Sequence, residues 1–254
     1  MRYPEPDPDA IVPTTSVVDP TAALPSMPLT AHLAELRNRL IWSIIAVALG
    51  GSVGFAFGEQ LIDLLKSPLP ADVTLQQIEI GDGFSIRLQI SLVVGIILAM
   101  PVLLWHVWRF IAPGLTPAEQ RSVLPWIPMA LVFFVLGVGI AWVVLPFAAQ
   151  FLLSFVPPGV ERAINIKSYF DFISGLFLAF GILMEFPILL VGLSRVRIVT
   201  SERPRRSRRV VILAIAIFAA VATPGGDVVS PFVLGLTLYI LSEGTTLFIR
   251  RTGR

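Results

Sequence analysis

Glu185 is the residue whose surroundings most strongly suggest a chemical role. It stands alone in an apolar stretch, since Phe172 to Met184 and Phe186 to Ser194 carry no charge. A charge at the centre of a bilayer costs about 2.5–3.5 kcal/mol on insertion scales, so such a group normally faces a protein interior or a cavity. We therefore expect Glu185 to make a functional polar contact inside a membrane. The alternative is a structural carboxylate that is protonated or bonded to a neighbouring helix.

Two further carboxylates, Glu35 and Glu119, lie in polar segments that also carry arginine. The stretch from Thr30 to Leu40 predicts an amphipathic helix in which Glu35 can pair with Arg39 one turn later. Thr116-Pro117-Ala118-Glu119 has the pattern of a capping box, with proline at the first helical position. A carboxylate also binds a guanidinium group through two parallel hydrogen bonds. Two spaced carboxylates could therefore hold two arginines.

A fourth carboxylate, Glu243, precedes Arg250 by about two helical turns. It either reaches the membrane surface or makes a polar contact within the helix bundle.

Several classes of chemistry are excluded by what the sequence lacks. There is no cysteine, so disulfides, thiolate catalysis and iron–sulfur clusters are ruled out. With only two histidines and no serine–histidine–aspartate set, zinc-protease motif or nucleotide-binding loop, we expect no catalytic residue, metal or cofactor. The expected function is therefore not that of an enzyme.

The composition is typical of a polytopic membrane protein, with 55% hydrophobic and 14% charged residues and a mean hydropathy of +0.82. A spanning helix needs about 20 mostly apolar residues. The sequence predicts an all-α integral membrane protein with six transmembrane helices near Leu40–Phe57, Leu88–Trp108, Val123–Val156, Phe172–Leu193, Val210–Ala222 and Val228–Leu241.

The predicted spans differ in length. Val123–Val156 would be about 50 Å long as one helix, so Pro146 and the Pro157-Pro158-Gly159 break are expected to mark where it ends and a surface segment begins. The last two spans are short, with apolar runs of about 20 Å, and the turn Thr223–Asp227 joins them in a hairpin.

The basic residues predict the orientation. Of the 19 lysines and arginines, 15 fall on the side of the two termini, which the positive-inside rule makes cytoplasmic. The run Arg195–Arg209 is then a cytoplasmic loop, and no nucleic-acid partner is expected. Residues 1–28 are acidic and proline-rich and predict a disordered cytoplasmic tail. The membrane domain covers residues 29–251, and residues 252–254 form a second tail.

The chain resembles the TatC family, the multispanning core subunit of the twin-arginine protein translocase. The resemblance covers about Pro28 to Arg251, and several motifs carry it in order: His32-Leu-Ala-Glu-Leu-Arg37, Phe110-Ile-Ala-Pro-Gly-Leu-Thr-Pro-Ala-Glu119, Ser168-Tyr169-Phe170, Ala179-Phe180-Gly181, Glu185-Phe186-Pro187, and Thr223-Pro224 with Asp227. The sequence departs from the family at Gln120, where a basic residue is common, at Asp82, in the hairpin turn and at Pro231.

The resemblance implies a role for each candidate residue. Glu35 and Glu119, with Phe110 and with Arg37 of the first motif, are expected to form the cytoplasmic site for twin-arginine signal peptides of folded cargo. Glu185 is expected to lie on a concave, glove-like membrane cavity and to contact the single-span partners TatA and TatB, and Glu243 is a further candidate for a partner or intramembrane polar contact. The loops Gly58–Gly83 and Gln150–Lys167 are expected to form an extracytoplasmic cap.

The function expected from the resemblance is that of a receptor and scaffold in the cytoplasmic (inner) membrane. It would work in several copies per complex and use the proton gradient for export. The alternative is a proton-coupled small-molecule transporter that uses Glu185 as its carrier. The absence of an internal repeat and of other ionisable groups near the membrane midplane argues against this alternative.

Overall fold

The computed structural model describes residues 29–157, 159–160, 162–188, 213, 215–221, 223 and 227–252. The predictions for the acidic tail, for the Arg195–Arg209 loop and for most of the 223–227 turn lie outside the described residues. The predicted fifth span is described only at residues 213 and 215–221, which are helical.

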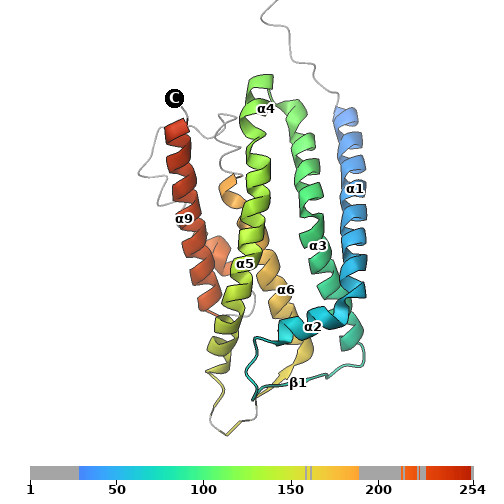
Figure 1. Cartoon of the computed structure of the whole chain (residues 1–254), viewed down its shortest axis with the longest axis vertical. Coiled ribbons are helices and arrows are strands. Elements are labelled where there is room, and N and C mark those ends of the chain that lie inside the picture. Colours follow the sequence, from blue (N-terminus) through green and yellow to red (C-terminus); the bar gives the residue numbers. More distant parts are fainter. Residues whose placement is uncertain are drawn as a thin grey trace, which may run out of the picture.

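Long helices that run along the long axis dominate the fold (Figure 1). They are α1 (Leu29–Ala56), α3 (Asp82–Ile111), α5 (Trp126–Leu153), α6 (Ile166–Leu183) and α9 (Val229–Thr252). Within the described part of the chain, four segments are long and apolar enough to cross a membrane: Thr30–Ala56, Asp82–Gly114, Glu119–Leu153 and Ile166–Ile188. They match the first four predicted spans. The apolar part of α9 is shorter, Val229–Gly244.

Glycines bring α1 and α3 into close contact. A Cβ atom added to Gly95 of α3 would lie 2.6 Å from the Val47 carbonyl oxygen, and one added to Gly50 would lie 2.9 Å from the Gly95 carbonyl oxygen. The absence of side chains therefore lets the two backbones touch, as small residues commonly do between membrane helices. Gly50 and Gly54 of α1 both lie against α3 in this contact, whereas Gly58 begins the next helix, α2 (Gly58–Lys66).

The long predicted third span is divided at its beginning and not at Pro146. A short helix, α4 (Pro117–Val123), precedes α5, which runs through Pro146 and ends at Leu153. The expectation that Pro146 could end the helix is therefore wrong, and the helix ends shortly before the second predicted break. A proline removes a single backbone hydrogen bond, and a helix packed against neighbours within a membrane tolerates that loss. Leu145 and Ala148 beside Pro146 are fully buried.

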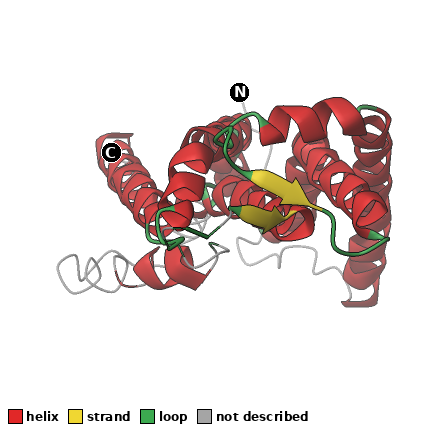
Figure 2. Ribbon diagram, turned by 90° about the horizontal axis from the view of Figure 1, so that it is seen from below, coloured by secondary structure: helices red, strands yellow, loops and turns green. Residues whose placement is uncertain are grey.

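Two short strands join loops that are distant in sequence at the end of the molecule where α2 lies. β1 (Thr74–Gln76) pairs in parallel with β2 (Ala163–Asn165), and the register places Leu75 opposite Ile164. Figure 2 looks at this end and shows the two strands across it. Arg162 forms a 2.8 Å ion pair with Asp72, and the Tyr169 hydroxyl donates a 2.8 Å hydrogen bond to the Leu65 carbonyl. The two predicted cap loops thus meet, through strands that were not predicted.

The core lies where α3, α5 and α6 meet and extends to α9. It includes Ile86 and Ile90 of α3, Leu145 of α5, Phe170 and Phe180 of α6, and Leu234 and Leu238 of α9. This core fixes α3, which carries Phe110 at its far end, and α6, which leads to Glu185.

Candidate functional site

The first part of the site lies where the beginning of α1 meets the end of α3. The rings of His32 and Phe110 are stacked, with centroids 4.4 Å apart and an angle of 21° between their planes. One turn further along α1, the Glu35 carboxylate accepts hydrogen bonds from the Arg39 guanidinium, through Nε at 3.1 Å and through Nη2. The predicted pair of Glu35 with Arg39 is therefore confirmed.

Only one oxygen of Glu35 is used in this pair. Both bonds from Arg39 end on Oε1, while Oε2 is buried and has no hydrogen-bond partner within the described part of the chain. A buried polar atom without a partner costs about 1–3 kcal/mol. Glu35 is therefore prepared to accept a hydrogen bond from a further donor.

The first part of α1 is amphipathic, and its polar face is turned toward the protein. His32, Glu35 and Arg39 are half-buried, whereas Leu33, Leu36 and Leu40 are exposed. This arrangement is the reverse of that in a water-soluble helix, in which the apolar side is buried. It suits a helix whose outer face contacts lipid while its polar groups gather beside α3.

The second part of the site is the segment between α3 and α5. η1 (Ala112–Gly114) follows α3, and Thr116 then caps α4. Glu119 Oε2 accepts 2.8 Å hydrogen bonds from the Thr116 backbone nitrogen and from the Thr116 hydroxyl, while Thr116 Oγ1 accepts from the Glu119 nitrogen at 3.4 Å. The predicted capping box is therefore confirmed, and it holds the Glu119 carboxylate in a defined position.

Gln120, one of the departures from the family pattern, has a structural role in this segment. Its side-chain amide donates hydrogen bonds to the carbonyls of Ala112 at 2.8 Å and of Leu115 at 3.2 Å. The amide ties α4 back to the turn that follows Phe110. Gln120 thereby fixes the position of Glu119 relative to Phe110.

The structure places most of the predicted signal-site residues in one region. The start of α1, the end of α3 and α4 lie at the same end of the molecule (Figure 1). Glu35 and Phe110 belong to the α1–α3 contact, and Glu119 lies on α4. Arg37 is exposed. Sequence reasoning did not assign His32 to the site, although His32 begins the first matching motif.

The surroundings of Glu185 differ from those of a residue inside a continuous helix. Regular α6 ends at Leu183, Met184 and Glu185 form a turn, and helical structure resumes at Phe186–Ile188. Pro187 explains the interruption, because it has no N–H to donate to the Leu183 carbonyl and its ring crowds that oxygen. The predicted span Phe172–Leu193 is matched by Ile166–Ile188, and the turn at Met184 and Glu185 within it was not predicted.

The Glu185 side chain is half-buried. Its Oε1 atom is buried and has no hydrogen-bond partner among the residues that the structure describes. The predicted polar contact is thus absent within this part of the chain, and an outside donor could provide it.

Glu243 is half-buried on α9. Over the described ranges, no group of three or more His, Asp or Glu side chains lies close enough to hold a metal ion.

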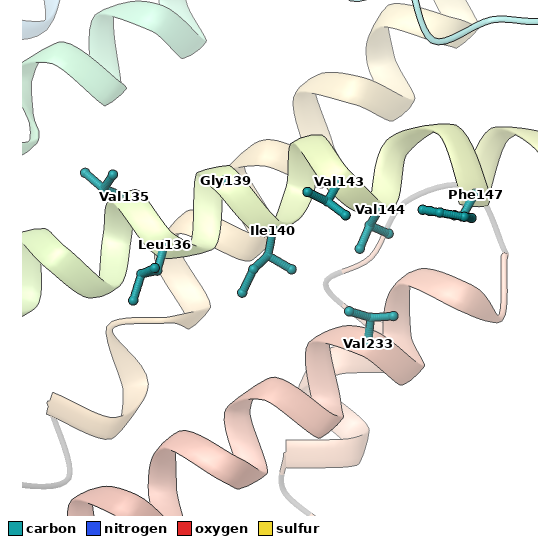
Figure 3. Close-up of a pocket in the computed structure, with 8 residues that line it drawn as sticks. All are labelled: Val135, Leu136, Gly139, Ile140, Val143, Val144, Phe147 and Val233. Atoms are coloured by element: carbon teal, nitrogen blue, oxygen red, sulfur yellow. The ribbon is translucent and has the colours of Figure 1, made fainter.

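An apolar groove of about 410 Å³ lies between α5 and α9. Figure 3 shows Leu136, Ile140 and Val144 on the side of α5 that faces α9, with Val233 pointing back from α9. None of the described residues that line it is charged. The groove therefore offers shape and apolar surface but no polar recognition.

Comparisons with known proteins agree with this architecture. The family model described as Sec-independent protein translocase protein (TatC) matches residues 31–236. The chain belongs to the TatC family. This family consists of translocase proteins, which agrees with the expectation that the chain is not an enzyme.

Curated TatC proteins match over nearly the whole chain. The protein of Carboxydothermus hydrogenoformans is 34% identical over 89% of this chain and 93% of its own length. The protein of Desulforapulum autotrophicum is 37% identical over 89% of this chain and 86% of its own length. The chain is also similar to a crystal structure described as the twin arginine translocase receptor TatC in DDM, with a TM-score of 0.73 and 33% identity over 85% of this chain and 98% of that one.

Proposed function

We propose that this protein is the receptor subunit of a twin-arginine translocase in the cytoplasmic membrane. It would bind the signal peptides of folded cargo and organise single-span partners for export driven by the proton gradient. The observation that carries the proposal is that the start of α1, the end of α3 and α4, which carry Glu35, Phe110 and Glu119, lie at one end of the molecule in a chain of the TatC family.

The two carboxylates suit a peptide with paired arginines. Guanidinium groups bind carboxylates through planar, charge-assisted hydrogen bonds. Glu35 has one buried oxygen that no described residue bonds, and the capping box holds Glu119 in place. Phe110, stacked on His32, offers an aromatic surface beside them against which a guanidinium can lie. Arg37 is exposed at the same end and belongs to the proposed site as its outer part.

The proposed membrane topology has six spans and cytoplasmic termini. Four long apolar helices, the helical residues 215–221 and the apolar part of α9 provide the segments. The start of α1 and the end of α9 lie at the same end of the molecule, as an even number of spans requires (Figure 1). The excess of basic residues then places this end in the cytoplasm. Residues 1–28 would be a dispensable tail before the membrane domain.

Glu185 is the proposed contact for the single-span partners TatA and TatB. Its buried oxygen lacks a donor in the described chain, and a polar side chain from a partner helix could supply one. Glu243 on α9 would add a second polar group. The contact would lie on the concave face that the family resemblance implies.

Binding of a labelled signal peptide to the purified protein in detergent tests the proposal. A peptide with two arginines should bind more tightly than the same peptide with two lysines, because an ammonium group cannot form the planar fork. Equal affinity for the two peptides would contradict arginine recognition. Failure of the protein to bind either peptide would contradict the receptor function.

A further inference from the structure

Three large apolar side chains are exposed just before and within the first turn of α3. Ile78, Ile80 and Phe84 have relative exposures of 69%, 102% and 65%. They lie at the end of the molecule opposite the proposed signal site, where the chain passes from β1 to α3 (Figure 1). Three such side chains in seven residues form a concentrated apolar surface, which in a soluble protein normally marks an interaction site.

The Ile78–Phe84 loop is held in a defined conformation. Asp82 is only 2% exposed, and its Oδ2 atom accepts hydrogen bonds from the backbone nitrogens of Ile78 at 3.3 Å and Glu79 at 2.9 Å. The Gln77 amide donates to the carbonyls of Glu79 at 3.0 Å and Ile80 at 3.3 Å. Polar groups thus close the inside of the loop, while the isoleucines remain outside.

The apolar surface of this loop continues into the outer face of α3. Phe84, Leu88 and Leu92 follow at intervals of four residues and are all more than half exposed. This spacing places them on one side of the helix. Leu88 and Leu92 also line an open groove that α3 shares with α1, and in a helix with the length and composition of a membrane span such an exposed apolar side is expected to face lipid. The loop therefore lies where a lipid-covered surface reaches the membrane boundary.

We propose that the Ile78–Phe84 loop is an anchor that inserts into the lipid interface at the end of α3. The 30 residues of α3 span about 45 Å, while the hydrocarbon core is about 30 Å thick. Helix length alone therefore does not set the depth of α3. An apolar anchor at its beginning would set that depth. It would thereby also set the position of Phe110, near the other end of α3, relative to the membrane surface.

The chemistry favours lipid tails and the apolar side of the headgroup layer over a charged headgroup. No lysine or arginine lies between Lys66 and Arg87, and Glu79 is exposed between the two isoleucines. The Arg87 guanidinium is already used by the Phe55 carbonyl, with bonds of 3.2 and 3.1 Å, and lies 3.9 Å from Glu59. Insertion should therefore depend on buried apolar surface and not on anionic lipid.

The absence of cysteine makes this proposal directly testable. Single variants Ile80→Cys, Leu92→Cys and Ala71→Cys would carry an environment-sensitive fluorophore in phosphatidylcholine vesicles at low protein density. Leu92 is a reference within the span, and Ala71 is an exposed reference on the same end of the molecule. Quenching by nitroxide lipids reports depth, and quenching by iodide reports exposure to water.

We expect the label at position 80 to be quenched by lipids that carry the nitroxide near the headgroup and to be protected from iodide. The label at position 92 should respond to deep nitroxides, and the label at position 71 to iodide. Iodide quenching at position 80 equal to that at position 71 would overturn the proposal. Protection from iodide without lipid quenching would also overturn it, because a second copy of the chain would then cover the loop.

A second measurement tests the effect on depth. A label on Val107→Cys, an exposed position near the other end of α3, should change its quenching depth when Ile78, Ile80 and Phe84 are replaced together by serine. Replacement of the exposed residues Ala71 and Gln76 by serine is the matched control and should leave the depth unchanged. An unchanged depth in the triple variant would overturn the role of the loop in positioning α3.

Discussion

Glu119 has two separable properties, its charge and its capping bonds. In Glu119→Gln, the amide oxygen can still accept the two bonds from Thr116, so the helix cap should survive. Loss of the charge should weaken binding of a twin-arginine peptide by about 1.5–3 kcal/mol if the pair is desolvated, and by less if water reaches it. Peptide titration alongside thermal unfolding measures both properties. Unchanged affinity would mean that Glu119 serves only as a cap.

Glu185 can be tested with substitutions that separate size, polarity and charge. Glu185→Gln keeps hydrogen-bonding groups and should assemble nearly normally with single-span partners. Glu185→Ala should keep the fold and signal binding but weaken crosslinks to partner helices and export. Glu185→Arg should impair both the crosslinks to partner helices and export, since arginine retains its charge in the membrane.

The control for Glu185 is Ile182→Ala, which removes an exposed apolar side chain just before the turn. It should leave partner crosslinks largely intact. Wild-type export and crosslinks in Glu185→Ala would show that the carboxylate has no role in partner binding.

The residues that were predicted correctly are those with local partners. Glu35 with Arg39 and Thr116 with Glu119 are separated by four and three residues, and the geometry of a helix alone brings them together. The stacking of His32 on Phe110 depends on how α1 and α3 pack, which no short pattern encodes. The contacts of Gln120 with Ala112 and Leu115 likewise depend on the conformation of the connecting turn.

At the scale of the elements, α5 offers a matched pair of glycines. A Cβ atom at Gly137 would lie 2.5 Å from the Phe180 carbonyl oxygen of α6, whereas one at Gly139 would meet no atom of the described residues within 4 Å. Gly137→Ala should therefore force α5 and α6 apart and destabilise the protein by about 1–3 kcal/mol. Gly139→Ala should be neutral or stabilise by up to about 1 kcal/mol through helix propensity.

Thermal unfolding in detergent distinguishes the two variants. A lower midpoint for Gly137→Ala alone would support close packing of α5 on α6. Equal midpoints for the two variants would mean that these helices can separate without cost.

Apolar length predicted the long helices well because a bilayer imposes that length on each span. It did not predict the division between α4 and α5 or the turn at Glu185, since a proline can start, bend or interrupt a helix according to its neighbours. Pro117 begins α4, Pro146 lies inside α5, and Pro187 follows the turn after α6. The pairing of β1 with β2 was also missed, because strands of three residues carry almost no periodic signal.

At the scale of the whole molecule, the two ends have different roles. The paired strands and nearby contacts join distant loops at one end, and the candidate signal site lies at the other end. Tyr169 bound to Leu65 and Arg162 bound to Asp72 link segments about 90 or more residues apart in sequence. The core of α3, α5 and α6 lies between the two ends. Glu35, Phe110 and Glu119 therefore make no direct contact with the paired strands, and the proposed Ile78–Phe84 anchor would act on Phe110 only through the depth of α3.

The orientation of the molecule in the membrane is the last prediction, and single cysteines can test it because the chain has none. A cysteine at Gly159, in the loop before β2, should react with a membrane-impermeant maleimide in intact cells. A cysteine added after Arg251 should react only after the cells are opened. The excess of basic residues on the side of the termini provides the physical reason. Labelling of the C-terminal cysteine in intact cells would contradict the topology and remove the proposed signal site from the cytoplasm.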